Sequence, residues 1–185
     1  MTDTELALYI GQENEIREYI KCRWDTNPIL HYSNDEDEPL LFYGGPFSNF
    51  VGPFMLLEHP WNGMPARYET VEHWFQANKA KHADQHEQVR QAFNPGKAKA
   101  IGQKVDMWTN WDEVKYGVML MGVREKFASE KWARILLSTG DRYIAEDSPT
   151  DAIWGIFNPE KDDFSGKNLL GLALMQVRAE LRGDV

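Results

Sequence analysis

The chain has 185 residues, a formal net charge of -9 at pH 7 and a sequence pI near 5.0, so a phosphate backbone would repel the molecule as a whole. Binding to bulk duplex nucleic acid is therefore not expected, although a local cluster of side chains could still hold one nucleotide or one base. The single cysteine, Cys22, excludes an intramolecular disulfide, and neither a secretory signal nor an apolar run long enough for a membrane span is found. We expect a cytoplasmic protein without a membrane segment.

The first 38 residues are expected to form an extension before the main domain. The spacing of apolar residues between Thr4 and Arg23 predicts an amphipathic helix. The segment from Asp25 to Pro39 contains a run of four acidic residues, 35–38, which indicates a solvated connector. We therefore predict an extension over residues 1–38 and one domain over residues 39–185.

Short strands are expected early in the domain, and helices dominate the rest. The predicted strands are Leu40–Tyr43, Phe54–Glu58, Pro65–Tyr68 and Tyr143–Ala145. The predicted helices are Val71–His82, Gln85–Phe93, Lys97–Gln103, Trp111–Ala128, Lys131–Ser138 and Asn168–Arg182. Thr70 is expected to cap the first of these helices and Asp84 the second. The pattern predicts a mainly helical α+β fold with a few short strands.

Three polar side chains share one narrow stripe of the helix predicted over residues 71–82. At about 100° per residue, Glu72, Gln76 and Lys79 project from the same side, and the rest of the helix forms a broad apolar arc. One interpretation is that this stripe simply faces water. The other is a site, because a carboxylate close to aromatic, amide and amine groups can have a tuned pKa.

The basic residues include candidates for a metal site and for a phosphate site. His82 and His86 have a spacing that could bind a metal on one helix, but the expected cap at Asp84 breaks that register and a third ligand is missing. We predict no metal site. Three lysines around one short helix could contact a phosphate or form ordinary solvated surface: Lys97, Lys99 and Lys104.

Three further segments could contribute to a site, and each has a structural alternative. Trp111, at the start of a long helix, could anchor the core or stack against a base. The loop Asp147–Gly155 combines acids, a tryptophan and a glycine, as the wall of a site would. The segment Gly166-Lys167-Asn168 could present backbone N–H groups to an anion or could be ordinary capping. No Ser-His-Asp elbow, Walker loop or GxGxxG fingerprint is present, and no cofactor is expected.

Taken together, these segments resemble the NADAR, or YbiA-like, family, which is known for N-glycosidases acting on ribosylated bases. The matching segments include Phe47-Ser48-Asn49-Phe50, residues 68–80 with the core EHxFQAxK, Trp111 with Lys115, Asp151 with Trp154-Gly155, and Gly166-Lys167-Asn168. Their order and spacing persist from about Phe42 to Leu181. The chain departs from the family at Gly102-Gln103, where Gly-Arg is common, so a possible phosphate-contacting arginine is absent there. It departs again at 156–159, where a glycine-rich run is common.

The resemblance implies a YbiA-like fold and a pocket lined by the Glu72 stripe. Breaking a ribosyl C–N bond builds positive charge on the sugar, so Glu72 would stabilise that charge or deprotonate water. Lys79 would act in a second route, attacking the ring-opened sugar to form a Schiff base. Asp151 would contact ribose hydroxyls or transfer a proton. The expected substrate-binding residues are Asn49 and Gln76 for positioning, Phe50 and Trp111 for base stacking, and Tyr68, Trp154, Lys167 and Asn168.

Two substrate classes fit the resemblance. One is the phosphoribosylamino-pyrimidines, which are riboflavin-pathway intermediates, and the other is ADP-ribose attached to guanine. The acidic pI disfavours a long duplex partner but permits an extruded or single-stranded base. The alternative from a different class is a non-catalytic module that senses an ADP-ribose-like ligand. The presence of both Glu72 and Lys79 favours the enzyme, because binding alone would not require an acid and an amine together.

Overall fold

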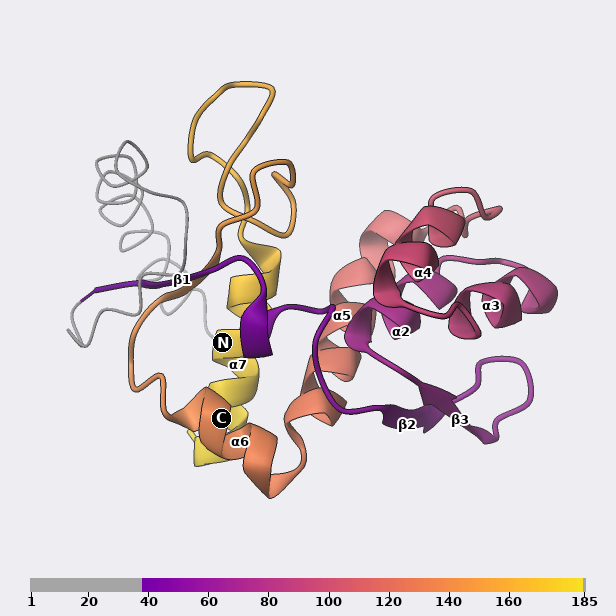
Figure 1. The fold of residues 1–185 in the computed structure, drawn as a ribbon, viewed down its shortest axis with the longest axis horizontal. Helices are drawn as coiled ribbons and strands as arrows, with labels where there is room; N and C mark the ends of the chain where they lie inside the picture. Colours follow the sequence, from indigo (N-terminus) through magenta and orange to yellow (C-terminus); the bar gives the residue numbers. More distant parts are fainter. Residues whose placement is uncertain (1–37, 185) are drawn as a thin grey trace. The chain divides into compact units, whose positions relative to one another are not determined.

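The computed structural model describes residues 38–184, which divide into two compact units (Figure 1). One unit contains residues 38–43 and 139–184, and the other contains residues 44–138. The helix predicted at Thr4–Arg23 lies outside the described residues, so the boundary at residue 38 stays a prediction. No helix within residues 38–184 combines the length and the apolarity that a membrane span requires.

The unit of residues 44–138 is built mainly from helices (Figure 1). In chain order its elements are a 3-10 turn η1 (Gly45–Phe47), β2 (Met55–Glu58), β3 (Pro65–Tyr68), α2 (Val71–Ala77), α3 (Ala83–Arg90), α4 (Pro95–Gly102), α5 (Trp111–Phe127) and α6 (Glu130–Leu137). Strands β2 and β3 pair antiparallel, with Met55 opposite Tyr68. This order confirms the predicted mainly helical α+β fold, with element ends that move by one to a few residues.

Helix α2 lies at the centre of this unit, and every one of its residues is buried. Helices α3, α4 and α5 pack against it. The Trp74 indole N–H donates to the Val118 carbonyl of α5 at 2.7 Å. A Cβ on Gly122 would lie 2.7 Å from Trp74 Cδ1, so α5 can approach α2 this closely only because residue 122 lacks a side chain. A helix buried on all sides has no solvated face, which overrides the amphipathic pattern of its sequence.

Helix α2 ends at Ala77, earlier than the predicted end at His82. Two contacts stop it. The Asn78 side chain donates to the Trp74 carbonyl at 2.8 Å, and Ala80 pairs with Met107 in an isolated antiparallel bridge. Because the bridge partner is distant in the sequence, local periodicity could not reveal this end. Lys79 therefore lies in a turn after the helix, and its predicted place on the helix is wrong.

The start of α3 also differs from the prediction. The capping position is His82, without a side-chain hydrogen bond, and Asp84 lies inside the first turn, where its charge complements the helix dipole. The predicted cap at Asp84 is therefore wrong. Helix α4, in contrast, has a complete cap, because the Asn94 side chain accepts from the Lys97 N–H at 2.8 Å and Pro95 occupies the first turn.

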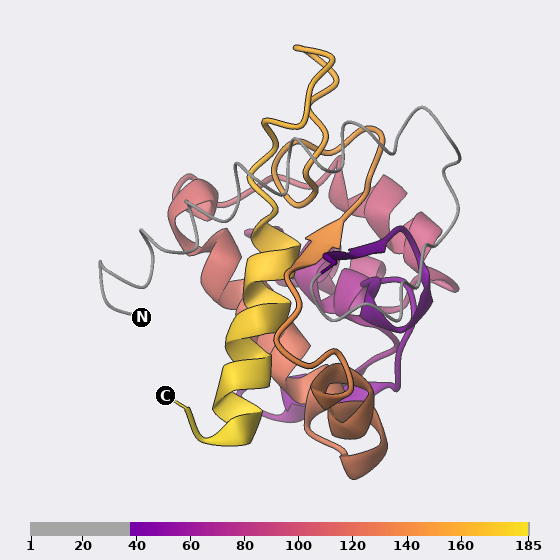
Figure 2. The same cartoon turned by 90° about the vertical axis from the view of Figure 1, so that its left-hand side faces the viewer.

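The unit of residues 38–43 and 139–184 combines two short strands with the last helix (Figure 2). Strand β1 (Leu40–Phe42) pairs in parallel with β4 (Ile144–Glu146), and α7 (Leu169–Arg182) packs against β4. The buried side chains of α7 recur at helical spacing: Leu170, Ala173, Leu174 and Val177. The buried Arg178 guanidinium donates to the Thr139 hydroxyl at 2.8 Å and to the Arg142 carbonyl at 2.9 Å, which holds the segment before β4 against α7.

Candidate active site

The amino-terminal end of α2 fixes the position of Glu72. The Thr70 hydroxyl accepts from the His73 backbone N–H at 3.4 Å, which confirms the predicted cap. The Glu72 N–H donates to the Asn49 carbonyl at 3.0 Å. Glu72 is only 5% exposed, and its Oε1 accepts from Gln76 Nε2 at 2.8 Å. The stripe therefore does not face water, and the interpretation of Glu72 and Gln76 as a solvated face is wrong.

Gln76 is 4% exposed, and one atom of its side-chain amide lacks a hydrogen-bond partner among the described residues. Its Oε1 is buried and has no hydrogen-bond partner among the described residues. A Cβ on Gly102 would lie 2.5 Å from this oxygen, so α4 approaches Gln76 through a position that only glycine fits. Leaving a buried acceptor unpaired costs about 1–3 kcal/mol. A carboxylate and an unsatisfied amide kept in a core at such a cost favour a functional role over a structural one.

Lys79 follows α2 on an aromatic support. Its side chain is half-buried, and its Nζ lies 5.3 Å from the centroid of the Phe75 ring, a cation–π distance. The Phe75 ring lies 5.1 Å from the Trp111 ring at an interplanar angle of 55°. The Lys79 carbonyl accepts from the Trp108 N–H at 3.1 Å, which fixes the backbone of the turn. An acid, an amide and an amine thus come from one short segment, residues 72–79, as predicted from the sequence.

The two residues predicted to stack on a base differ in accessibility. Trp111 is 5% exposed, so most of its surface belongs to the core. Phe50 is 40% exposed, and Lys99 Nζ of α4 lies 5.9 Å from its ring centroid. Of the two rings, only that of Phe50 has enough accessible surface to stack on a base, and the Lys99 ammonium lies beside it. Lys97 and Lys104 are also exposed, which fits either of their predicted uses.

Tyr68 supports this region from within the core. It is fully buried, its hydroxyl lies 2.8 Å from His86 Nε2, and its ring meets the Trp74 ring edge-on. Burial raises the pKa of Tyr68 well above its usual value. A side chain so enclosed favours a supporting role over a direct substrate contact.

The two histidines considered as metal ligands have separate partners. His82 Nε2 lies 3.0 Å from Asp106 Oδ2, and His86 is buried against Tyr68 and the His59 ring. Burial lowers the pKa of His86 to about 4. Within residues 38–184, no group of three or more His, Cys, Asp or Glu side chains is arranged to hold a metal ion.

Asp151 and Trp154 lie in the unit formed by residues 38–43 and 139–184, within a tightly closed loop. Asp151 Oδ1 accepts from the Ile153 and Trp154 N–H groups, both at 2.9 Å. A Cβ on Gly155 would lie 2.8 Å from the Asp151 carbonyl oxygen and 2.9 Å from that of Glu146, so glycine is required there. One carboxylate oxygen of Asp151 is thus committed to the loop.

Asp147 begins the loop that the sequence indicates as a candidate wall of a site, but no individual role is predicted for it. Its Oδ1 is buried without a hydrogen-bond partner among residues 38–184, and burial raises the pKa of Asp147 to about 6. A carboxyl with this pKa can hold or release a proton near neutral pH, which suits acid–base chemistry. The sequence carries no signal for its burial, because Asp147 in a polar loop looks like any solvated acid.

The start of α7 does not offer free amides to an anion. Five successive backbone N–H groups, those of residues 166–170, donate to backbone carbonyls of residues 152–156 at 2.8–3.2 Å. The donors of the predicted segment, residues 166–168, are thus already used by the fold. The alternative of anion binding by these N–H groups is therefore wrong. The Lys167 side chain is exposed and stays available to a ligand.

Asn168 is fully buried and structurally committed. Its Nδ2 donates to the Tyr143 hydroxyl and to the Ile144 carbonyl, both at 2.9 Å, and its Oδ1 accepts from the Glu146 N–H at 3.1 Å. Its backbone is left-handed, with a φ of 51°, a conformation that asparagine tolerates better than most residues. These bonds tie β4 to the start of α7, which favours a structural role over the predicted substrate contact.

Comparison with known proteins gives consistent matches. Residues 41–182 match the NADAR domain model. An N-glycosidase of Nostoc punctiforme is 35% identical over 144 residues, covering 75% of this chain and 86% of that protein. N-glycosidase YbiA of Escherichia coli is 33% identical over 157 residues, covering 83% of this chain and 88% of that protein. The riboflavin biosynthesis protein PYRR of Zea mays is 32% identical over 175 residues, covering 88% of this chain and 26% of that protein. The NMR structure of E. coli YbiA aligns with a TM-score of 0.67 at 31% identity, covering 80% of this chain and 87% of that one.

Proposed function

The chain belongs to the NADAR domain family, and from this premise we propose that it hydrolyses the bond between a ribose and the nitrogen of a base. The relatives named as N-glycosidases are matched over 86% and 88% of their own length, so the similarity covers nearly the whole of each. Hydrolysis of an N-glycosyl bond is the reaction class. The observation that carries the proposal is the buried Glu72 carboxylate, hydrogen-bonded to Gln76 in the segment that also holds Lys79.

We assign Glu72 to contact with the reacting carbon of the sugar. As the C–N bond breaks, positive charge develops at the anomeric carbon, and a carboxylate held away from water stabilises that charge more strongly than one in solvent. Gln76 supports this role, because its amide N–H holds Oε1 of the carboxylate in place. The Glu72 carboxylate can also accept a proton from the attacking water.

Lys79 opens a second, covalent route. In the ring-opened form of the substrate, C1 is bonded to the base nitrogen as an imine. The Lys79 amine adds to C1, the base departs with a proton, and water then cleaves the new C=N bond to return the amine and release the sugar as an aldehyde. The half-buried position of Lys79 against the Phe75 ring supports this assignment, because it holds the amine partly away from water.

The other predicted residues are assigned either to substrate contact or to structural support. Phe50 is assigned to contact with the base, since its ring is accessible. Asn49 is assigned to positioning, since it is buried and its backbone carbonyl accepts a hydrogen bond from the Glu72 N–H. Trp111 and Tyr68 support the segment from the core. The assignments of Asp151, Trp154 and Lys167 to substrate rest on the resemblance to the family, and Asn168 is assigned to architecture.

Two substrates remain candidates within this reaction class: ADP-ribosyl-guanine and a phosphoribosylamino-pyrimidine. Both present a ribosyl C–N bond and a phosphate, and the names of relatives point to N-glycosidase action and to riboflavin biosynthesis. The net charge of -9 supports a small molecule or a single exposed base over a duplex. We place the activity in the cytoplasm, in keeping with the single cysteine.

Incubation with each substrate separates these possibilities. Purified protein is mixed with ADP-ribosylated guanosine or with the phosphoribosylamino-pyrimidine, and released ADP-ribose or ribose 5-phosphate is measured. We expect turnover of one substrate by the wild type and almost none by Glu72→Gln. Saturable binding of ADP-ribose without any product from either substrate would contradict hydrolysis and favour the sensor.

A further inference from the structure

Lys126 is a buried lysine to which the proposed reaction assigns no role. It is 1% exposed, and its Nζ donates to the Ser48 carbonyl at 2.8 Å. The ammonium lies 5.2 Å from the Phe127 ring centroid and 5.3 Å from that of Trp132. No carboxylate among residues 38–184 forms an ion pair with it, and burial lowers the pKa of Lys126 to about 7. A lysine kept in such a place carries a cost in stability.

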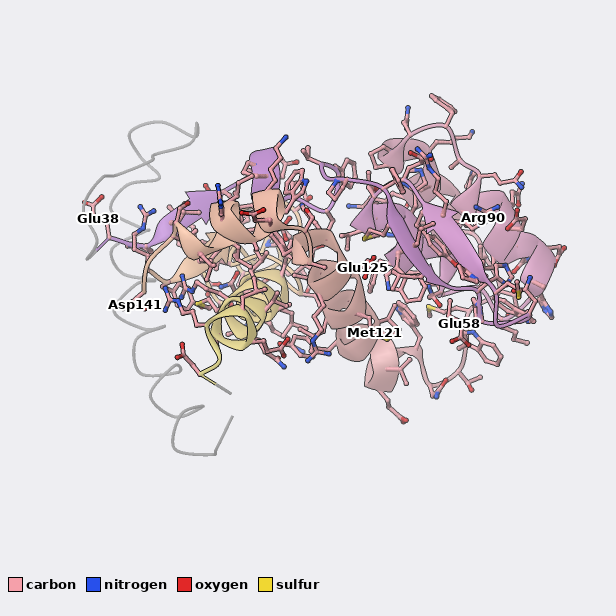
Figure 3. The ribbon with its side chains drawn as sticks, turned by 90° about the horizontal axis from the view of Figure 1, so that it is seen from below. Glu38, Glu58, Arg90, Met121, Glu125 and Asp141 are labelled. Carbon is pink, nitrogen blue, oxygen red and sulfur yellow. The ribbon has the colours of Figure 1, made fainter. Side chains whose placement is uncertain are left out.

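The position of Lys126 on α5 explains its burial. Gly122, Val123 and Lys126 are buried, whereas Met121 and Glu125, which Figure 3 labels, are more exposed. Lys126 therefore occupies the core-facing side of the helix, where an apolar residue is expected. Its polar end is directed at one backbone carbonyl rather than at solvent.

That carbonyl belongs to the loop formed by residues 47–52. The Ser48 carbonyl accepts from Lys126 Nζ and also from the Val51 N–H, at 3.2 Å, which closes a tight turn. On the far side of the turn, a Cβ on Gly52 would lie 3.1 Å from Lys126 Cε, so the loop lies directly against the lysine side chain. The neighbouring residue, Asn49, is the one whose carbonyl accepts from the Glu72 N–H at 3.0 Å.

We propose that Lys126 is a positioning residue that anchors the 47–52 loop, so that Asn49 holds the start of α2, and with it Glu72, in the geometry required for catalysis. This inference rests on the proposed function, because Glu72 carries the reaction there. The chain of contacts is continuous: Lys126 to Ser48, Ser48 to the adjacent Asn49, and Asn49 to Glu72. The role assigned to Lys126 is positioning and not substrate contact, because its Nζ donates to the Ser48 carbonyl and its side chain is 1% exposed.

A purely structural role makes a different prediction. Replacing a buried charge by an apolar side chain of similar volume is often neutral or stabilising. Lys126→Met is therefore expected to keep or raise the thermal midpoint, while it removes the bond to Ser48. If Lys126 served stability alone, a Lys126→Met variant as stable as the wild type would also be as active as the wild type.

The test combines hydrogen exchange with kinetics on the full chain. Amide exchange is measured at Glu72, whose N–H donates to Asn49, in the wild type, in Lys126→Met and in Gly52→Ala. The alanine Cβ at position 52 is expected to displace the lysine by a few tenths of an ångström, so it disturbs the same anchor from the loop side. Val123→Ala, a buried change on the same helix, is the matched control.

We expect exchange at Glu72 to be roughly tenfold faster or more in Lys126→Met, with a smaller rise in Gly52→Ala and none beyond the stability change in Val123→Ala. The value of kcat is expected to fall in the same order, and Lys126→Arg, which retains a cationic donor, is expected to recover part of it. Unchanged exchange at Glu72 in a folded Lys126→Met variant would overturn the proposal. Because exchange needs no substrate, this result is independent of the proposed function, which fails separately if the wild type releases no product.

Discussion

The segment around α2 and the segment around the start of α7 both carry polar residues in motif-like patterns, and they use them differently. In the first, the Glu72 and Gln76 side chains are buried, and Gln76 Oε1 has no hydrogen-bond partner among the described residues. In the second, the Asn168 side chain makes three hydrogen bonds within the fold, and the backbone amides of residues 166–170 donate to residues 152–156.

This difference separates residues that carry chemistry from residues that carry architecture. A polar group whose bonding capacity is fully used by its own fold has none left for a ligand. A buried carboxylate beside an unsatisfied amide, in contrast, is retained at a cost in stability that a catalytic role explains. The comparison predicts that changes in the α2 segment reduce activity at constant stability, and that changes at Asn168 reduce stability at constant activity.

The largest expected effect is that of Glu72→Gln. Removing the carboxylate leaves the positive charge of the transition state without its counter-charge, and kcat should fall by roughly 10²–10⁴-fold. The amide has nearly the same volume, so the thermal midpoint should change little. The matched control is Glu69→Gln, a more exposed acid that pairs with Arg67. Comparable activity of the two variants would contradict the catalytic role assigned to Glu72.

Lys79→Ala is expected to have the next largest effect. We expect kcat to fall by about 10²-fold, since the covalent route is lost. Sodium borohydride added during turnover should attach the sugar to the wild type and not to the variant, as measured by intact-protein mass. Lys81→Ala, which removes an exposed lysine paired with Asp106, is the control and should label normally. Labelling of Lys79→Ala at the wild-type level would place the Schiff base on another amine and contradict the role assigned to Lys79.

Asn168→Ala tests the structural role of Asn168 at the start of α7. It leaves the Glu146 N–H and the Ile144 carbonyl without side-chain partners and places alanine at a left-handed position, so the free energy of unfolding in urea should fall by about 2 kcal/mol. Per folded molecule, kcat/KM should stay within about twofold of the wild type. Lys167→Ala, at the neighbouring exposed position, should leave stability unchanged. A folded Asn168→Ala variant that loses activity would assign Asn168 to the substrate after all.

The smallest effect concerns Asp147. Its pKa is raised by burial to about 6, so the folded state binds a proton more tightly than the unfolded state between about pH 4 and pH 6, and the free energy of unfolding falls as pH rises through that window. Asp147→Asn has no carboxyl group to ionise, so its free energy of unfolding should not fall in this way between pH 4 and pH 6. At pH 8 we expect the variant to be more stable by about 1 kcal/mol after allowing for partial exposure. Glu160→Gln, at an exposed acid, is the control and should be as stable as the wild type in urea unfolding at pH 8.

Local signals in the sequence predicted most of the fold. The Thr70 cap, strand β3 and the start of α5 at Trp111 follow from side-chain chemistry within a few residues, and the structure has them where the sequence predicts them. The end of α2 was missed because a bridge between Ala80 and Met107 ends it, and contacts across such sequence distances leave no periodic trace.

The candidate site was predicted in part. The order Glu72, Gln76 and Lys79 is visible in the sequence, but burial is not, so the solvated alternative could be excluded only by the structure. Lys126 had one usable signal, a charged residue on the otherwise apolar side of a helix, and Asp147 was indicated only as part of a polar loop, without a signal for its burial. The commitment of Asn168 to three bonds depends on how β4 meets α7, which a single sequence does not encode locally.

The most direct test of the central claim is a crystal structure of Glu72→Gln with uncleaved substrate bound. We expect the anomeric carbon to lie within roughly 3.5 Å of the side chain at position 72, with the Lys79 amine facing the same ribose. A ribose bound elsewhere, with residue 72 and Lys79 contacting only protein, would contradict it.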